Sequence, residues 1–179
     1  MGLFTNSIKP AGGLASGYEG GIIQMKYTPV RGVVSNSTSD SGNHCSEFDT
    51  TITPKTTQSR IIIQGFFGAV SSSGGNSFAI TVRRGSTVID DLRASADGSR
   101  SRYTMRGATT WNADQNHCHS YSLNVLDYPN TTSAVTYRIY VSCESNGTLY
   151  FGRNRYNGSS SSPIYSRAMS SLLVMEVTR

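Results

Sequence analysis

The chain has 179 residues, of which 36% are hydrophobic and 15% are charged, and its formal net charge at pH 7 is +5. This length suffices for one domain, or one domain with an arm, that is stable without a metal or disulfides. The low charge content and the many Ser, Thr, Asn and Gly residues exclude an acidic disordered chain and a typical helical cytosolic enzyme. The composition is typical of β-proteins on extracellular or virion surfaces.

The first twenty residues contain Gly and Pro and show no hydrophobic period. We therefore expect residues 1–20 to form an extended N-terminal arm and residues 21–179 to form a single β-sandwich domain. Leu3, Phe4 and Ile8 are candidates for docking this arm on a neighbouring subunit, and the alternative is a disordered terminus. The segment lacks the basic and apolar regions of a signal peptide, so we expect synthesis in a host cytoplasm without secretion.

Several segments alternate between apolar and polar residues with the period of two that is typical of half-buried strands. The first is IIQMKYT (22–28), and a polar stretch that we expect to be a loop follows at 35–43. A strand then leads into Pro54. The continuous apolar run RIIIQGFFGAV (60–70) is typical of a strand at the centre of a sheet. Residues 77–91 predict a hairpin with Arg84-Gly85 at its tip.

The stretch SLNVLDYPNTTSAVTYRIYV (122–141) contains two alternating runs separated by DYPNTTS. Pro129 fixes its own φ and Asn130 tolerates left-handed conformations, so this segment is a turn or loop. We expect the two runs to be consecutive antiparallel strands that form one hairpin. A short strand at 148–153 follows Asn146-Gly147, a dipeptide that favours a tight hairpin turn.

The last run, SSLLVMEV (170–177), places Leu173, Met175 and Val177 on one face of a strand. In total we expect nine or ten strands at fairly regular spacing and no helix. An all-β sandwich with Greek-key or jelly-roll topology is the common solution for such a pattern. No apolar stretch approaches the length of a membrane span, so we expect no membrane insertion.

The histidines and cysteines allow one metal hypothesis. His117 and His119 flank Cys118, and His44 precedes Cys45, so His44, His117 and His119 are candidate zinc ligands. The spacing matches no established zinc pattern, and we favour histidines at polar strand ends, without metal. With Cys143 the cysteines number three, so no complete disulfide framework forms within one chain. Two alternatives are open for Cys45 and Cys118: they pair across two strands, or both are free thiols.

No catalytic constellation is predicted. Asp90 and Asp91 are adjacent, and neighbours in a strand point to opposite faces, so they cannot flank one glycosidic bond. Calcium-loop, phosphate-loop and serine-hydrolase motifs are absent from the sequence. We therefore predict a protein that is not an enzyme and that uses no cofactor.

The densest basic stretch is RASADGSRSRYTMR (93–106), which carries four Arg residues. Such a cluster is compatible with nucleic-acid binding. However, Asp90, Asp91 and Asp97 lie within or beside it, and no helix-turn-helix, zinc-finger or RNA-platform motif accompanies it. We expect a solvated face that pairs subunits and no nucleic-acid partner.

A second Arg-rich and aromatic segment is YFGRNRYNG (150–158). Arg and Tyr are favoured anchors of interfaces, so Arg153, Arg155 and Tyr156 are candidates for surface recognition of a subunit or a glycan. The alternative is a hairpin whose aromatic residues pack on the core.

Four segments, in this order, resemble a family of small structural proteins of tailed phages, especially marine and cyanobacterial ones. They are GGIIQMKY, ITPKTTQSRIIIQ (52–64), VLDYPNTTSAVTYRIYV (125–141) and SSLLVMEV. The family has an "ITP…S-K/R-I-L-I" strand, a "D-x-P…TT-x-x-Y-x-V" hairpin and a closing "mEv/mEi" strand. The resemblance covers roughly residues 20–177.

The resemblance implies a jelly roll similar to the tumour-necrosis-factor fold, which forms homotrimers used as capsid decoration, head-fibre or tail-fibre knobs. In such a trimer one sheet faces its neighbours, and the N-terminal arm, with Leu3, Phe4 and Ile8 as anchoring candidates, fastens the knob to the particle. The interface candidates are aromatic: Tyr137, Tyr140, Tyr150, Phe151 and Tyr165.

Three functions are compatible with these observations. We favour a non-enzymatic, trimeric virion structural protein on the outer surface of the phage, with the major capsid protein or another virion component as its partner. The alternative is a receptor- or glycan-binding tip of a tail fibre, with a host-surface glycan as ligand. A polysaccharide-cleaving tailspike is disfavoured, because no suitable carboxylate pair and no parallel β-helix repeat are present.

Overall fold

The computed structural model describes residues 21–37, 42–73, 77–108, 118–144, 147–156, 158, 161 and 167–177. These residues form eleven strands and one short 3-10 helix, η1 (Asp90–Leu92). All of the strand pairings are antiparallel. The predicted arm at residues 1–20 lies outside the described residues.

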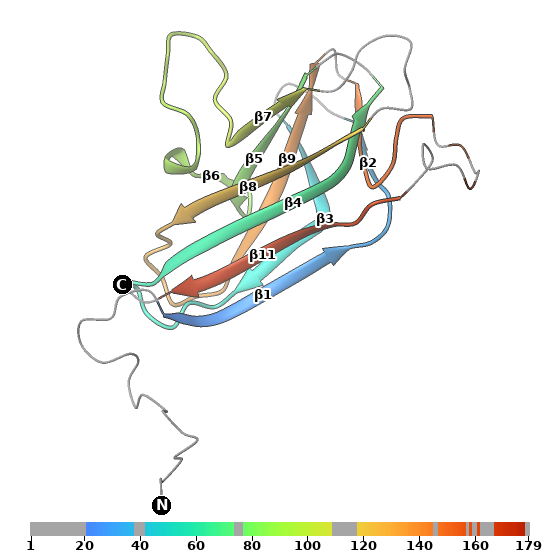
Figure 1. The fold of residues 1–179 in the computed structure, drawn as a ribbon. Helices are drawn as coiled ribbons and strands as arrows, with labels where there is room; N and C mark the ends of the chain where they lie inside the picture. The colour runs from blue at the N-terminus through green and yellow to red at the C-terminus, as the bar shows by residue number, and fades with distance from the viewer. Residues whose placement is uncertain are drawn as a thin grey trace, which may run out of the picture.

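The first sheet is built around the long apolar strand β4. Figure 1 shows β8, β4, β11 and β1 side by side across the front of the molecule. The end of β4 also pairs with β10, which in turn pairs with β2. The strands are β1 (Ile22–Val30), β2 (Val34–Ser37), β4 (Arg60–Ser72), β8 (His119–Asp127), β10 (Thr148–Phe151) and β11 (Ser170–Val177). The prediction that the run at 60–70 lies at the centre of a sheet is confirmed.

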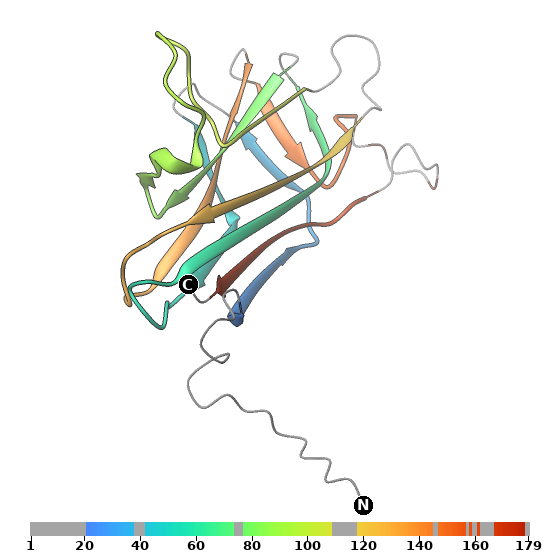
Figure 2. The ribbon, with the colours of Figure 1, turned by 60° about the vertical axis from the view of Figure 1, so that its left-hand side comes forward.

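The second sheet lies behind the first in Figure 1, and Figure 2 shows the same two sheets turned by 60°. Its order is β3-β9-β5-β6, and β7 also pairs with β5. The strands are β3 (Asn43–Ile52), β5 (Ser77–Arg84), β6 (Thr87–Val88), β7 (Met105–Ala108) and β9 (Val135–Cys143). The chain passes repeatedly from one sheet to the other, so strands that are neighbours in space are distant in sequence. The predicted all-β jelly-roll sandwich is confirmed.

The predicted hairpin at 122–141 is wrong, although both of its strands exist. β8 pairs with β4 in the first sheet, whereas β9 pairs with β3 and β5 in the second. The DYPNTTS segment therefore crosses between the sheets. Asn130 has a φ of 51°, as expected for a left-handed loop residue. The alternation of apolar and polar residues shows which face of a strand is buried, but it does not show which strand is its partner. Two strands on opposite sides of one core therefore have the same pattern as two paired strands.

Two further local predictions need correction. The segment 35–43, expected to be a loop, contributes most of β2 and begins β3. β10 does not form a hairpin with β9 but pairs with β2 and β4. The predicted hairpin tip at Arg84-Gly85 is confirmed by the pairing of β5 with β6, and Gly85 has a φ of 56°.

The core lies between the two sheets and contains an aromatic cluster. Phe48 of β3, Phe67 of β4 and Phe151 of β10 are fully buried, with ring centroids 5.4–5.6 Å apart. Offset and edge-on contacts at this spacing are favourable for aromatic rings. The cluster joins strands of both sheets.

A buried polar cluster also joins the sheets. The carboxylate of Asp127, at the end of β8, is 2% exposed and accepts two hydrogen bonds of 2.8 Å from the Arg84 guanidinium on β5. The hydroxyl of Tyr137, on β9, donates a third hydrogen bond of 2.6 Å. Burial and this hydrogen bond raise the pKa of the Tyr137 phenol. The bidentate geometry fixes the position of β8 relative to the second sheet.

We predict that Asp127→Ala lowers the free energy of unfolding by about 3 kcal/mol, because it leaves the Arg84 charge and the Tyr137 hydroxyl without their shared acceptor. Tyr137→Phe, which removes a single hydrogen bond, should cost about 1 kcal/mol. Urea unfolding measures both changes.

The matched control is Asp97→Ala, which breaks the exposed contact of Asp97 with Arg100 and should leave stability unchanged. Equal stability of the Asp127→Ala variant and the wild type would show that the cluster does not hold the sheets together.

Candidate subunit interface

The outer face of the first sheet carries three cross-strand rows of side chains. Strand alternation sends every second residue of β1, β11, β4 and β8 outward, and the pairing register aligns these residues. The first row is Met25, Met175, Ile62 and Leu126; the second is Tyr27, Leu173, Gln64 and Asn124; the third is Pro29, Ser171, Phe66 and Ser122. We call these three rows the apolar face.

The apolar face exposes large hydrophobic side chains. Met25 is 58% exposed, Tyr27 53%, Phe66 44% and Leu126 38%. An antiparallel sheet whose outer face is in water normally carries polar residues there. A contiguous apolar patch on a soluble protein is typical of an interaction site.

None of the residues in the three rows is charged. Depletion of charge, together with Met and aromatic side chains, is the composition of the core of a protein interface. The outer face of the second sheet is different. There Asp49 accepts hydrogen bonds from His44 at 2.6 Å and from Arg138 at 3.2 Å, and the Arg83 guanidinium lies 3.8 Å from the centroid of the Tyr140 ring. The two outer faces are thus chemically distinct.

A shallow hollow of about 440 Å³ lies within the apolar face. Tyr27 and Leu173 line one side of it, Ser122 and Asn124 the other, and Phe66 stands beside it. The face therefore offers both projecting side chains and a recess, and the amides and hydroxyls in it can form hydrogen bonds across a contact.

A buried carboxylate supports the edge strand of this face. Glu176 of β11 is fully buried and accepts hydrogen bonds from Gln24 Nε2 of β1 at 2.6 Å, from the Lys55 amide at 2.6 Å and from the Ser59 hydroxyl. Burial opposes ionisation of Glu176, but the three hydrogen bonds outweigh it and hold the pKa of this carboxyl below its ordinary value. The Gln24 hydrogen bond ties Glu176 to β1, which carries Met25 and Tyr27, and the other two tie it to the connection between β3 and β4.

The structure corrects two of the predicted interface residues. Tyr137 and Phe151 are fully buried in the core of the subunit. The prediction that they contact a neighbouring subunit is therefore wrong. Both residues occupy positions whose side chains point into the core. The residue type alone does not show this, because an aromatic side chain suits a core and an interface equally well.

The other interface candidates lie away from the apolar face or outside the described residues. Tyr140 is on the outer face of the second sheet, where it stacks on His44 with ring centroids 5.3 Å apart. Tyr150 is on β10, with the Arg153 guanidinium 4.0 Å from its ring centroid. Tyr165 lies outside the described residues.

The structure places the recognition candidates after β10. Arg153 donates hydrogen bonds to the backbone carbonyls of Asn154 and Arg155, both at 3.1 Å. Arg155 and Tyr156 are exposed. The anchoring candidates Leu3, Phe4 and Ile8 lie outside the described residues.

The candidate zinc ligands are not brought together where they can be described. His44 bonds to Asp49 in β3, His119 begins β8, and His117 lies outside the described residues. In the described part of the chain no group of three or more His, Cys, Asp or Glu residues is placed to hold a metal ion.

Cys45, Cys118 and Cys143 are free thiols, and burial raises the pKa of Cys45 to about 12. Over the described residues, no helix is long and apolar enough to cross a membrane.

The sequence analysis did not identify Met25, Ile62 and Leu126 as candidate interface residues. The last strand contained a sign of this face, because it has apolar residues on both of its sides: Leu173 and Met175 on one, Leu172 and Val174 on the other. Leu172 and Val174 are the buried pair. Apolar residues on both faces are typical of a strand that is covered on both sides, so this pattern marks β11 as a candidate interface strand.

Comparisons with known proteins give structural similarity alone. No family model matches the chain, and no curated protein matches it. Among solved structures it is similar to VP2 of infectious bursal disease virus in derived T=1 particles, with 12% identity, a TM-score of 0.34, and coverage of 88% of this chain and 37% of that chain. The VP2 subviral particle of the same virus gives 11% identity, a TM-score of 0.34, and coverage of 88% and 40%. The chain thus spans less than half the length of these proteins.

We predict that acid weakens the fold partly through Glu176. Because its pKa is lowered by folding, Glu176 stabilises the protein above its ordinary pKa of 4.5, and this stabilisation is lost as the pH falls through the lower folded value. The Glu176→Gln variant should be less stable at neutral pH and should lack this part of the pH dependence. Unfolding curves across the acid range measure both effects.

The control for this experiment is Glu47→Gln, which replaces an exposed carboxylate of β3. That variant should keep the acid dependence of the wild type. Identical acid profiles for Glu176→Gln and wild type would contradict the assigned role of Glu176.

Proposed function

We propose that this protein is a non-enzymatic structural subunit of a virus particle, and that it forms a homotrimer on the outer surface of the capsid. The observation that carries the proposal is the apolar face, which is exposed in the subunit and bears no charge. Burial of such a face between subunits removes Met25, Tyr27 and Leu126 from water, and apolar burial is the main driving force of association.

The net charge of the chain opposes self-association, and this opposition is weakest at the apolar face. Each chain carries a net charge of +5, so copies repel one another, and the repulsion is smallest where no charged side chains face each other. The three rows of the apolar face contain no charged residue. Copies of this chain can therefore meet there through apolar contacts.

The number of copies and the location follow from the sequence resemblance. The phage structural proteins that the four segments resemble form trimers with one sheet facing the neighbours, and β1, β11, β4 and β8 would be that sheet here. Residues 1–20 would fasten the trimer to the major capsid protein or another virion component.

The alternative function uses the same fold and the same trimer. A receptor-binding tip of a tail fibre would also project a jelly roll from the particle. The number of copies in a virion separates this function from capsid decoration, because a capsid lattice offers many equivalent sites and a tail offers few.

We predict that Leu126→Arg dissociates the assembly. The substitution places a charge at the end of the first row, on β8, where burial in the proposed contact would leave it without a partner. Sedimentation of the wild type should give the mass of three 19.3-kDa chains, and the variant should give the mass of one.

The matched control is Val88→Arg, because Val88 is 37% exposed, as Leu126 is at 38%, but lies on β6 of the second sheet. This control should remain trimeric. A wild-type protein that is monomeric at micromolar concentration would contradict the proposal. So would a Leu126→Arg variant that folds normally and still forms trimers.

For the location, we expect quantitative mass spectrometry of purified virions to find hundreds of copies of this chain relative to the major capsid protein. This result would fit a decoration protein on the capsid lattice. A few copies per virion would contradict the capsid location and favour the tail.

A further inference from the structure

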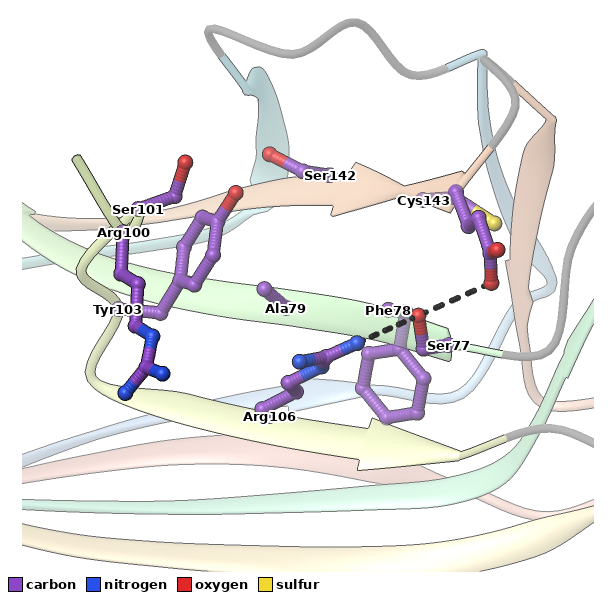
Figure 3. Close-up of a pocket in the computed structure, with 10 residues that line it drawn as sticks. Ser77, Phe78, Ala79, Arg100, Ser101, Tyr103, Arg106, Ser142 and Cys143 are labelled. Carbon is purple, nitrogen blue, oxygen red and sulfur yellow. Dashed lines mark hydrogen bonds between the residues drawn. The ribbon is translucent and has the colours of Figure 1, made fainter.

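A groove crosses the outer face of the second sheet, on the side of the sandwich opposite to the apolar face. It consists of two adjoining hollows of about 470 and 230 Å³ that share Ser101, Tyr103 and Ser142. Figure 3 shows the larger hollow, with Ala79 on β5 as its floor and Tyr103 and Arg106 beside it.

The segment between β6 and β7 forms one wall of the groove and is held in place by specific hydrogen bonds. The Thr104 amide donates to the Ile80 carbonyl at 3.0 Å, and the Thr104 hydroxyl accepts from the Val82 amide at 3.0 Å. Further along, the Ala94 amide donates to the Tyr103 carbonyl at 3.2 Å, and Arg102 Nε donates to the Ala94 carbonyl at 2.6 Å. The wall is therefore preformed, as most small-ligand sites are.

The lining of the groove is strongly basic. Five of the thirteen Arg residues of the chain line it, whereas one acidic residue, Glu144, does so; the five are Arg83, Arg93, Arg100, Arg102 and Arg106. Asp90 and Asp97 neutralise part of this charge, because Asp90 contacts Arg93 and lies 3.4 Å from Arg102, and Asp97 contacts Arg100. The remaining excess is positive and favours an anionic ligand.

Arg106 is the cation best placed to meet such a ligand. Its guanidinium is exposed and donates one hydrogen bond, from Nη2 to Ser77 Oγ at 3.2 Å (Figure 3). Among the described residues no carboxylate lies within ion-pair distance of it. The planar guanidinium can bind a carboxylate or sulfate group through two parallel hydrogen bonds.

The rest of the lining suits a polyhydroxylated ligand. Ser77, Ser101 and Ser142 offer hydroxyl groups that both donate and accept. Ser77 also donates to Glu144 Oε2 at 3.2 Å, so an acceptor for ligand hydroxyls lies beyond Arg106. The Tyr103 ring offers an apolar surface for the C–H face of a sugar ring, together with its own polar hydroxyl.

We propose that this groove binds an acidic saccharide, in which a carboxylate or sulfate group meets Arg106 and the sugar ring lies beside Tyr103. A nucleic acid fits the groove less well. Its backbone carries a charge at every phosphate and needs a continuous row of available cations, whereas Asp90 and Asp97 already contact three of the Arg side chains here. The site lies on β5, β7 and β9 and their connections, so it stays accessible when the apolar face is covered. This proposal does not depend on the trimer.

The experiment is an array of matched neutral, uronic-acid, sialylated and sulfated oligosaccharides, followed by titration calorimetry with trigalacturonate, a sulfated galactose trisaccharide and neutral galactotriose. We expect binding to acidic members, and the carboxylate and sulfate arms show which anion is preferred. Arg106→Gln should weaken the binding at least about tenfold, because it removes a charged hydrogen-bond donor. The unfolding curve of this variant should match that of the wild type.

Arg31→Gln is the matched control, because it removes an exposed Arg that lies outside the groove, between β1 and β2. It should bind as the wild type does, and so should the Leu126→Arg variant, which separates this test from that of the trimer. Binding to no acidic saccharide at millimolar concentration, or equal binding by wild type and Arg106→Gln, would overturn the proposal. Binding confined to a short single-stranded oligonucleotide would also overturn it and assign the groove to nucleic acid.

Discussion

The buried carboxylate of Asp127 fixes how the two sheets of this sandwich lie on one another. Arg84 and Tyr137 reach it from the second sheet, while Asp127 itself ends β8 of the first. A buried charge is tolerated when its partner and its hydrogen bonds are complete, and it then permits few alternative arrangements. The aromatic cluster of Phe48, Phe67 and Phe151 fills the space between the same sheets without fixing their register in this way. Both outer faces depend on this placement.

The two outer faces have different chemistry, and the proposed function assigns a different role to each of them. The three rows that cross β1, β11, β4 and β8 contain no charged residue, which suits contact between copies of a positively charged chain. The face of β3, β9, β5 and β7 carries Arg side chains and a groove, which suits contact with something else. The opposed faces of one sandwich would allow the protein to assemble through one sheet and to recognise a ligand through the other. Glu176 supports the face proposed for assembly, because its hydrogen bond from Gln24 holds the edge strand that carries Met25 and Tyr27.

Much of the fold could be predicted from the sequence, since alternation marks most of the long strands and the apolar run at 60–70 marks the centre of a sheet. The partner of each strand could not be predicted in the same way: β8 and β9 have the pattern of a hairpin, but they lie in different sheets. The roles of Tyr137 and Phe151 were misassigned for a related reason, because their residue type suits an interface and their strand parity places them in the core. The Arg residues of 93–106 form a charge cluster in the sequence. The groove itself could not be predicted, because only the fold brings Ser77 and Ser142 beside them.

The central claim is that the apolar face is covered by other copies of this chain. Hydroxyl-radical footprinting read by mass spectrometry tests it most directly, because it reports which side chains meet water in the assembled protein. Tyr27 is 53% exposed in the subunit and Tyr156 is 60% exposed, so an isolated subunit should label both at similar rates. The account predicts that Tyr27 is protected at high protein concentration and becomes labelled on dilution, while Tyr156 is labelled throughout. Similar labelling of both residues at every concentration would contradict the account.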